Sequence, residues 1–225
     1  RGYWDIANSA QNSIVALQKA HELGLYGSEF DVLITSDSVP VVNHDDKIEG
    51  KLIEATPYAL LRDIKLKNGE MIPTLEQYLV HGKAYGTTQL ILEIKPHKTK
   101  ENEDRAVRMI TAMVDAYQLQ AQVEYISFSM NICKELKRLR PDCIVSYLNG
   151  DKSPAEIKEI GLSGIDYHHK VLTDHKDWIK EARELGLLVN VWTVNDAAMM
   201  QHFIKEKVDF ITTDKPAVLK KLLEQ

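Results

Sequence analysis

Apolar and polar residues follow two recurring patterns along the chain, one typical of buried strands and the other typical of amphipathic helices. Short apolar runs bounded by turn residues predict strands, and apolar residues spaced by three and four positions predict helices. We expect strands at 28–35, 89–94, 123–127, 143–148, 164–167, 188–192 and 209–212. We expect helices at 12–23, 74–82, 101–118, 131–139, 154–160, 174–185, 195–206 and 216–223.

This alternation of strands and helices indicates βα units and a parallel sheet. Seven strands are visible, and an eighth would close a (β/α)8 barrel. The natural place for that strand is immediately before Arg1, so we expect the chain to begin at the end of a truncated first strand. A doubly wound open sheet is the alternative, but no glycine-rich turn follows an early strand. The pattern therefore favours an α/β fold of the TIM-barrel class.

The residues between the strand at 28–35 and the helix at 74–82 interrupt this regular order. Turn residues and a short extended segment at 40–43 lead into a polar, irregular stretch from about 46 to 70. We interpret 36–73 as a small hairpin and loop insertion after the second strand of the barrel. Because no linker, repeat or low-complexity tract is visible, we expect a single barrel domain over 1–225.

The charge and the apolar runs of the chain argue against two kinds of partner, nucleic acid and the interior of a lipid bilayer. The chain has a formal net charge of −5 with interspersed signs, which argues against a nucleic-acid surface. No apolar run approaches the roughly 18 residues of a membrane span, so we expect no stable insertion into a bilayer. Cys133 and Cys143 lack metal-ligand spacing and are expected to be small buried residues. The start at Arg1, without methionine, favours a periplasmic or secreted protein over a cytoplasmic one.

Five residues with chemically active side chains lie at or near the ends of the predicted strands. Glu29 and Asp31 share one strand, Glu93 and Lys95 fall on a later one, and His44 follows the extended segment. Because side chains alternate along a strand, each pair points to one face. Active sites of βα barrels lie at the carboxyl ends of the strands, where these side chains would converge. Such a cluster suits a hard divalent cation and an anionic substrate.

Several motifs follow one another in an order that is similar to a known family. They are Arg1-Gly2, Ala10-Gln11-Asn12-Ser13, Glu29-Phe30-Asp31-Val32, Thr35, Asp37, Pro40-Val41-Val42-Asn43-His44-Asp45, Glu93-Ile94-Lys95, Ser127-Phe128, Trp192-Thr193-Val194-Asn195 and Thr212-Thr213-Asp214-Lys215-Pro216. On these residues the chain resembles the glycerophosphodiester phosphodiesterase family. Members of that family are TIM barrels that hydrolyse glycerophosphodiesters with a bound divalent metal, and the match spans nearly the whole chain.

The resemblance implies a metal site and an acid–base residue. Glu29, Asp31 and Glu93 would be the metal ligands, and Ca²⁺ and Mg²⁺ both prefer such oxygen ligands. His44 would transfer protons, since histidine exchanges protons near neutral pH. Lys95 would stabilise charge on the phosphoryl oxygens. The simpler alternatives are a solvated polar strand face for the carboxylates and an ordinary loop position for His44.

The same resemblance assigns residues to the substrate. Arg1 would assist in binding the phosphoryl group, and Trp192 could form an apolar wall for the glycerol moiety, although a packing role is about equally favoured. The family usually has glutamate at the position of Gln11. Because the amide of Gln11 carries no charge, its role would be to orient its partners and not to neutralise their charge. Tyr167 ends another strand and is a further substrate-binding candidate, although surface exposure is the favoured interpretation for it and the two following histidines.

We therefore predict metal-dependent hydrolysis of a small glycerophosphodiester to glycerol 3-phosphate and an alcohol. The family pattern begins with a histidine before the position of Arg1, and it usually has glutamate at the position of Gln11. At these two positions the sequence departs from the pattern. These departures support an alternative, a non-catalytic binding module for phosphorylated polyols. A phospholipase of the sphingomyelinase D type is a second alternative, disfavoured because no basic, aromatic-rich membrane face is visible. The head group, the metal and the oligomeric state are left open.

Overall fold

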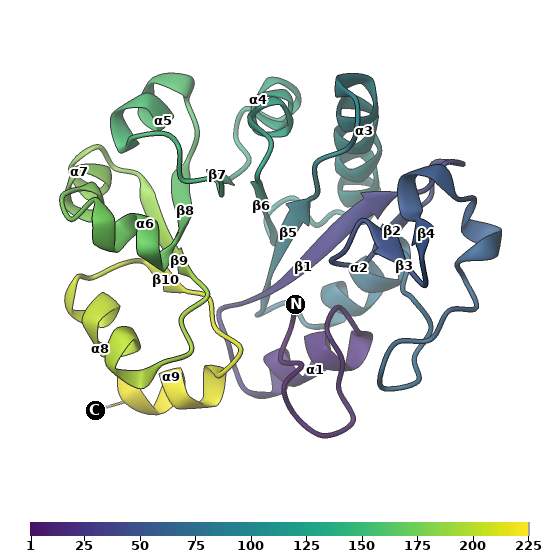
Figure 1. Ribbon diagram of the computed structural model, residues 1–225, viewed down its shortest axis with the longest axis horizontal. Helices are drawn as coiled ribbons and strands as arrows, with labels where there is room; N and C mark the ends of the chain where they lie inside the picture. Colours follow the sequence, from purple (N-terminus) through teal and green to yellow (C-terminus); the bar gives the residue numbers. More distant parts are fainter. Residues whose placement is uncertain (225) are drawn as a thin grey trace. The chain divides into compact units, whose positions relative to one another are not determined.

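The computed structural model describes residues 1–224, which group into two compact units that divide after Tyr125 (Figure 1). The first unit contains α1 (Ile14–Glu22), β1 (Gly27–Ile34), β2 (Pro40–Val42), β3 (Lys47–Ile48), β4 (Lys51–Leu52), η1 (Ile53–Ala55), η2 (Tyr58–Leu60), α2 (Leu75–Ala84), β5 (Gln89–Ile94) and α3 (Lys100–Ala116). Strand β6 (Val123–Ser127) spans the division. The second unit contains β7 (Val145–Tyr147), β8 (Gly164–His168), β9 (Leu188–Trp192) and β10 (Phe210–Ile211), with α4 (Met130–Leu139), α5 (Pro154–Ile160), α6 (His169–Asp174), α7 (Trp178–Glu184), α8 (Ala197–Lys205) and α9 (Pro216–Leu223).

The sheet of the first unit is built around β1, the strand shown in purple in Figure 1. Strand β1 pairs in parallel with β5 and antiparallel with β2. The parallel register places Asp31 opposite Glu93 and Val32 opposite Ile94. Helix α1 begins at Ser13, whose hydroxyl accepts a hydrogen bond from the backbone N–H of Ala16, as an N-cap residue does. The register therefore aligns acidic residues of two strands that lie far apart in the sequence.

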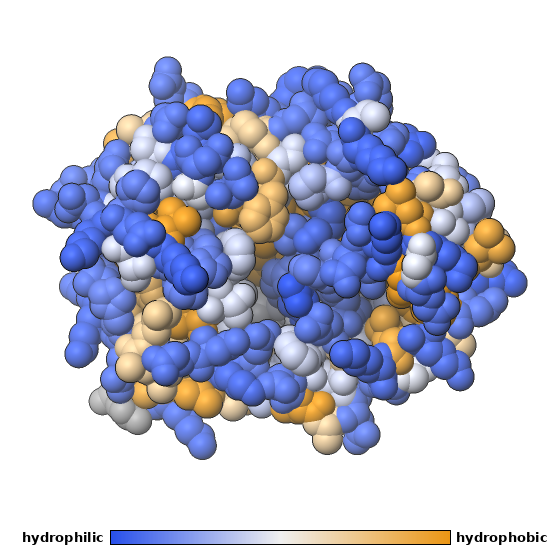
Figure 2. All heavy atoms as spheres, in the orientation of Figure 1, coloured by the Kyte–Doolittle hydropathy of each residue, from blue (hydrophilic) through white to orange (hydrophobic). Residues whose placement is uncertain are grey.

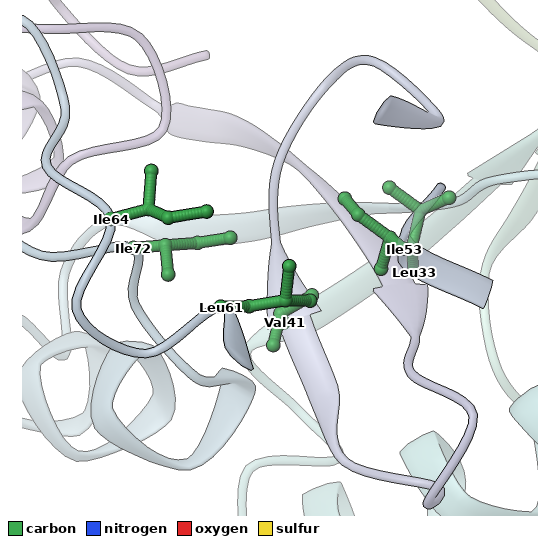
Figure 3. Close-up of a cluster of buried hydrophobic side chains, with 6 residues drawn as sticks. All are labelled: Leu33, Val41, Ile53, Leu61, Ile64 and Ile72. Atoms are coloured by element: carbon green, nitrogen blue, oxygen red, sulfur yellow. The ribbon is translucent and has the colours of Figure 1, made fainter. Parts of the chain in front are cut away.

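The insertion at 36–73 has a core of its own. It contains β2, the antiparallel hairpin of β3 and β4, and two short 3-10 turns, η1 and η2. Figure 3 shows the buried apolar side chains that join this segment to β1 and β2: Leu33, Val41, Ile53, Leu61, Ile64 and Ile72. The stretch from 46 to 70, expected to be irregular, is thus held on β1 and β2 by apolar burial.

The strands of the second unit run in the order β7, β8, β9 and β10, and neighbours pair in parallel. One predicted helix is wrong there, because 174–185 is not continuous: α6 ends at Asp174 and α7 begins at Trp178. Helix α6 begins earlier because the His168 imidazole accepts a hydrogen bond from the Lys170 N–H and caps it. Histidine is an uncommon cap, so the sequence pattern did not indicate this start. The strands predicted at 143–148 and 209–212 are shorter than expected.

The sequence predicts that both cysteines are buried and that no segment of the chain spans a membrane. Cys133 is buried and Cys143 half-buried, and neither forms a disulfide. Across residues 1–224, no helix has both the length and the apolar composition needed to cross a membrane. On the face in Figure 2, apolar side chains form small separate groups among hydrophilic ones. The expectation of one domain over 1–225 stays a prediction.

Candidate active site

Three carboxylates from β1 and β5 come together in the first unit. Within the described residues, Glu29, Asp31 and Glu93 offer oxygen atoms that all lie within 4.8 Å of one another. Asp31 and Glu93 are buried, and Glu29 is half-buried. Glu29 and Asp31 share a face of β1, and the parallel register adds Glu93 from β5. An all-oxygen donor set of this kind fits a hard divalent cation such as Ca²⁺ or Mg²⁺.

Two basic side chains contact this acidic group. The Nζ atom of Lys95 lies 3.2 Å from Asp31 Oδ1 and 2.9 Å from Glu93 Oε1. The guanidinium of Arg1 places Nε 3.9 Å from Asp31 Oδ2, and its Nη1 donates a hydrogen bond of 3.1 Å to Gln11 Oε1. The structure therefore brings together the three predicted metal ligands, both predicted phosphoryl-binding residues and Gln11.

Burial and mutual repulsion change the protonation of this group. Burial, with a contribution from the neighbouring Asp31 charge, raises the pKa of Glu93 to about 8, and Lys95 offsets this only in part. Burial also raises the pKa of Glu29. For Asp31 burial acts in the same direction, but the charges of Lys95 and of the N-terminal ammonium, together with the Asn12 amide, outweigh it and hold the pKa below its ordinary value. A divalent cation would therefore compete with a proton at this site.

His44 lies beside the acidic group because the strand that precedes it is bonded to β1. The backbone N–H of Asn43 donates a 3.0 Å hydrogen bond to the carbonyl of Asp31. The Nδ1 atom of His44 lies 2.7 Å from Asp45 Oδ1. A carboxylate can only accept, so Nδ1 carries the hydrogen in this pair and Nε2 is left to exchange a proton. The His44 side chain is 36% exposed.

Asn12 is a functional candidate that the sequence analysis did not single out. Its side chain is buried and donates a 2.9 Å hydrogen bond to Asp31 Oδ2. The only signals in the sequence were its place next to Gln11 and its residue type, since Asn12 adopts a left-handed conformation, φ 60°, that asparagine tolerates well.

The two remaining candidates lie in the second unit. Trp192, at the end of β9, donates a 2.9 Å hydrogen bond from Nε1 to the Asp166 carbonyl. Its ring makes edge contacts with Phe128, at 5.6 Å between centroids, and with His168, at 5.0 Å. Residues that follow three different strands thus form one aromatic group. The role of Trp192 as a wall for glycerol stays a prediction.

Tyr167 is not exposed, and the expectation of a surface position for it was wrong. The residue lies within β8, where its side chain is fully buried and its hydroxyl donates a 2.7 Å hydrogen bond to the Lys152 carbonyl. Both faces of β8 are buried from Gly164 to Tyr167, and only His168 at the strand end is partly exposed. A substrate-binding role for Tyr167 stays a prediction. The hydroxyl that would bind substrate already donates to the Lys152 carbonyl.

The chain is similar to known proteins of one family. Residues 3–218 match the model of the glycerophosphoryl diester phosphodiesterase family. A curated glycerophosphodiester phosphodiesterase of Caldanaerobacter subterraneus subsp. tengcongensis is 24% identical over 239 residues, which cover 98% of this chain and 95% of that protein.

Two solved structures of phosphodiesterases are similar to this chain in fold. A crystal structure of a glycerophosphodiester phosphodiesterase from Parabacteroides distasonis is 50% identical, with a TM-score of 0.99 over 100% of this chain and 94% of that one. A phosphodiesterase of Oleispira antarctica in complex with the product sn-glycerol-3-phosphate is 22% identical, with a TM-score of 0.85 over 100% of this chain and 95% of that one. These likenesses confirm the predicted TIM-barrel fold class.

Proposed function

The chain belongs to the glycerophosphoryl diester phosphodiesterase family, and on that premise we propose that it hydrolyses glycerophosphodiesters to glycerol 3-phosphate and an alcohol with the help of a divalent cation. The observation that carries the proposal is the group of Glu29, Asp31 and Glu93, with oxygens within 4.8 Å of one another and a lysine in contact with two of them. The Oleispira antarctica relative with sn-glycerol-3-phosphate bound supports the product.

The three carboxylates would hold the cation. They are supplied by two adjacent parallel strands, so the rigid sheet fixes their spacing before any ion arrives. Calcium and magnesium both accept this donor set, and neither is favoured by the residues alone. When bound, such an ion would offset negative charge on the phosphoryl oxygens.

Lys95 and Arg1 would bind the phosphoryl group. Both carry permanent positive charge beside the acidic group, and both can donate hydrogen bonds to non-bridging oxygens. Such donors lower the barrier where charge develops during displacement at phosphorus. Gln11 accepts a hydrogen bond from Arg1 and would orient that guanidinium without neutralising it.

His44 would move a proton at Nε2. Its Nδ1 hydrogen points at Asp45, which fixes the ring orientation and leaves Nε2 for the nucleophile or the leaving alcohol oxygen. Trp192, whose ring lies against Phe128 and His168, remains our candidate for an apolar surface beside the glycerol carbons.

The proposal is tested by incubating the full-length protein with glycerophosphocholine and glycerophosphoglycerol in Ca²⁺, Mg²⁺ or EDTA. We expect release of glycerol 3-phosphate with either or both cations and none in EDTA. Equal turnover in EDTA would exclude the metal requirement. Binding without turnover would favour the polyol-binding module, and hydrolysis of choline phospholipid vesicles would favour the sphingomyelinase D type.

A second measurement addresses the acid–base role. His44→Ala should lower kcat by about 10² to 10⁴, the usual contribution of a positioned acid or base. His81→Ala is the matched control, because His81 is an exposed residue in the last turn of α2. Wild-type turnover in His44→Ala would remove this histidine from the mechanism.

A further inference from the structure

One buried amide bonds a single residue of the proposed metal site with both of its ends, the carboxylate with one and the backbone with the other. The Nδ2 atom of Asn12 donates to Asp31 Oδ2 over 2.9 Å, and Asn12 Oδ1 accepts the backbone N–H of Asp31 over 3.2 Å. The orientation of this amide is unambiguous, because a carboxylate can only accept and a backbone N–H can only donate. Asn12 is 2% exposed, so water does not compete for either bond.

Asn12 itself is held rigidly. Its backbone N–H donates to the carbonyl of Arg1 over 3.1 Å, and its φ of 60° places it in the left-handed region. The next residue, Ser13, caps α1. The Glu70 carboxylate of the insertion accepts the first two N–H groups of that helix, from Ile14 at 2.9 Å and from Val15 at 3.3 Å. The side-chain amide of Asn12 is therefore held in a fixed position between the start of α1 and β1.

We propose that Asn12 is a positioning residue for the metal ligand Asp31. By holding Oδ2 and the backbone of Asp31, it fixes the rotation of the carboxylate so that Oδ1 faces Lys95, the residue that also contacts Glu93. The inference rests on the metal site of the proposed function. Outer hydrogen-bond partners that orient metal ligands typically change metal affinity by about 10- to 100-fold when they are removed.

The experiment measures Ca²⁺ binding by titration calorimetry, together with the melting temperature in EDTA. Asn12→Gly removes the amide and keeps a residue that accepts positive φ without strain. Asn12→Ala removes the same amide but adds backbone strain at this φ. We expect both variants to bind Ca²⁺ about 10- to 100-fold more weakly than the wild type, with the alanine variant melting at the lower temperature.

The chain offers a matched control in the second unit. Asn195 donates from Nδ2 to Asp214 Oδ2 over 2.8 Å, and its Oδ1 accepts the Asp214 N–H over 2.9 Å. Asn195→Ala thus deletes an equivalent pair of hydrogen bonds around an aspartate outside the acidic group, together with one from the Thr213 hydroxyl, and we expect its Ca²⁺ affinity to equal that of the wild type.

Three results would overturn the inference in distinguishable ways. Wild-type Ca²⁺ affinity in Asn12→Gly would exclude the positioning role and leave the metal site intact, and a loss seen only in Asn12→Ala would then be an effect of the backbone. An equal loss in Asn195→Ala would assign the loss to general destabilisation. A wild type that binds no Ca²⁺ or Mg²⁺ would remove the metal site, and the inference with it.

Discussion

Replacing Glu93 with glutamine should change how the affinity for a divalent cation depends on pH. Burial and the Asp31 charge raise the pKa of Glu93 to about 8, so this carboxyl is largely protonated at neutral pH when no cation is bound. A ligand carboxyl must lose its proton to bind a metal. Cation binding to the wild type should therefore release a proton and strengthen as the pH rises toward 8.

The size of the effect follows from that pKa. Each pH unit below it lowers the fraction of ionised Glu93 tenfold, which corresponds to about 1.4 kcal/mol. Apparent Ca²⁺ affinity should thus be about 10-fold weaker at pH 7 and about 100-fold weaker at pH 6 than at pH 9. Glu93→Gln has no proton to lose at this position, so its curve should flatten toward the smaller slope that Glu29, whose pKa is also raised, can contribute.

The assay is calorimetric titration with Ca²⁺ between pH 6 and 9, in buffers of different ionisation enthalpy that report proton release. The comparison is between wild type, Glu93→Gln and a matched control, Glu101→Gln, which makes the same chemical change on the exposed side of α3. The control should follow the wild-type curve. A wild-type affinity independent of pH, or a full wild-type slope in Glu93→Gln, would show that Glu93 is not the carboxyl that loses its proton when the cation binds.

Other predictions concern stability. Lys95→Met should lower the free energy of unfolding in EDTA by about 3 kcal/mol, because it removes the cation that contacts both buried carboxyls and leaves Asp31 with only the more distant Arg1; an unchanged urea midpoint would contradict this. In EDTA the wild type should lose stability as the pH rises from about 4.5 to 8, because the raised pKa of Glu93 means that the folded state holds a proton the unfolded state releases; melting temperatures that rise across this range would have the wrong sign. Ile53→Ala should cost about 2–5 kcal/mol in urea denaturation, because this side chain is fully buried in the core of the insertion. Leu60→Ala, in the same insertion but 62% exposed, should change the unfolding free energy by less than about 0.5 kcal/mol, and equal losses would argue against that core.

The regular part of the fold could be predicted from sequence because its strands are short apolar runs and its helices are periodic. Strands β5, β6 and β9 begin and end where the pattern placed them. The insertion itself could be predicted, but its apolar core could not, because its buried residues, such as Ile53 and Leu61, are too irregularly spaced to show a period. The start of α6 depends on His168 as a cap, which local propensity does not reveal.

The candidate site also has a part that could be predicted from the sequence and a part that could not. Strand alternation was enough to place Glu29 with Asp31 and Glu93 with Lys95, because that relation is local. The register that brings the two strands together is not local. Neither is the approach of Asn12 to Asp31, which depends on where the start of α1 packs against β1. Such contacts are formed by tertiary structure, and no spacing in the sequence indicates them.

The most direct measurement is a crystal structure of the protein grown with millimolar Ca²⁺, examined in an anomalous difference map. We expect one ion bonded to Glu29, Asp31 and Glu93, with calcium–oxygen distances of about 2.3–2.6 Å. A map with no shared ion among these three carboxylates, at a Ca²⁺ concentration that supports turnover, would contradict it.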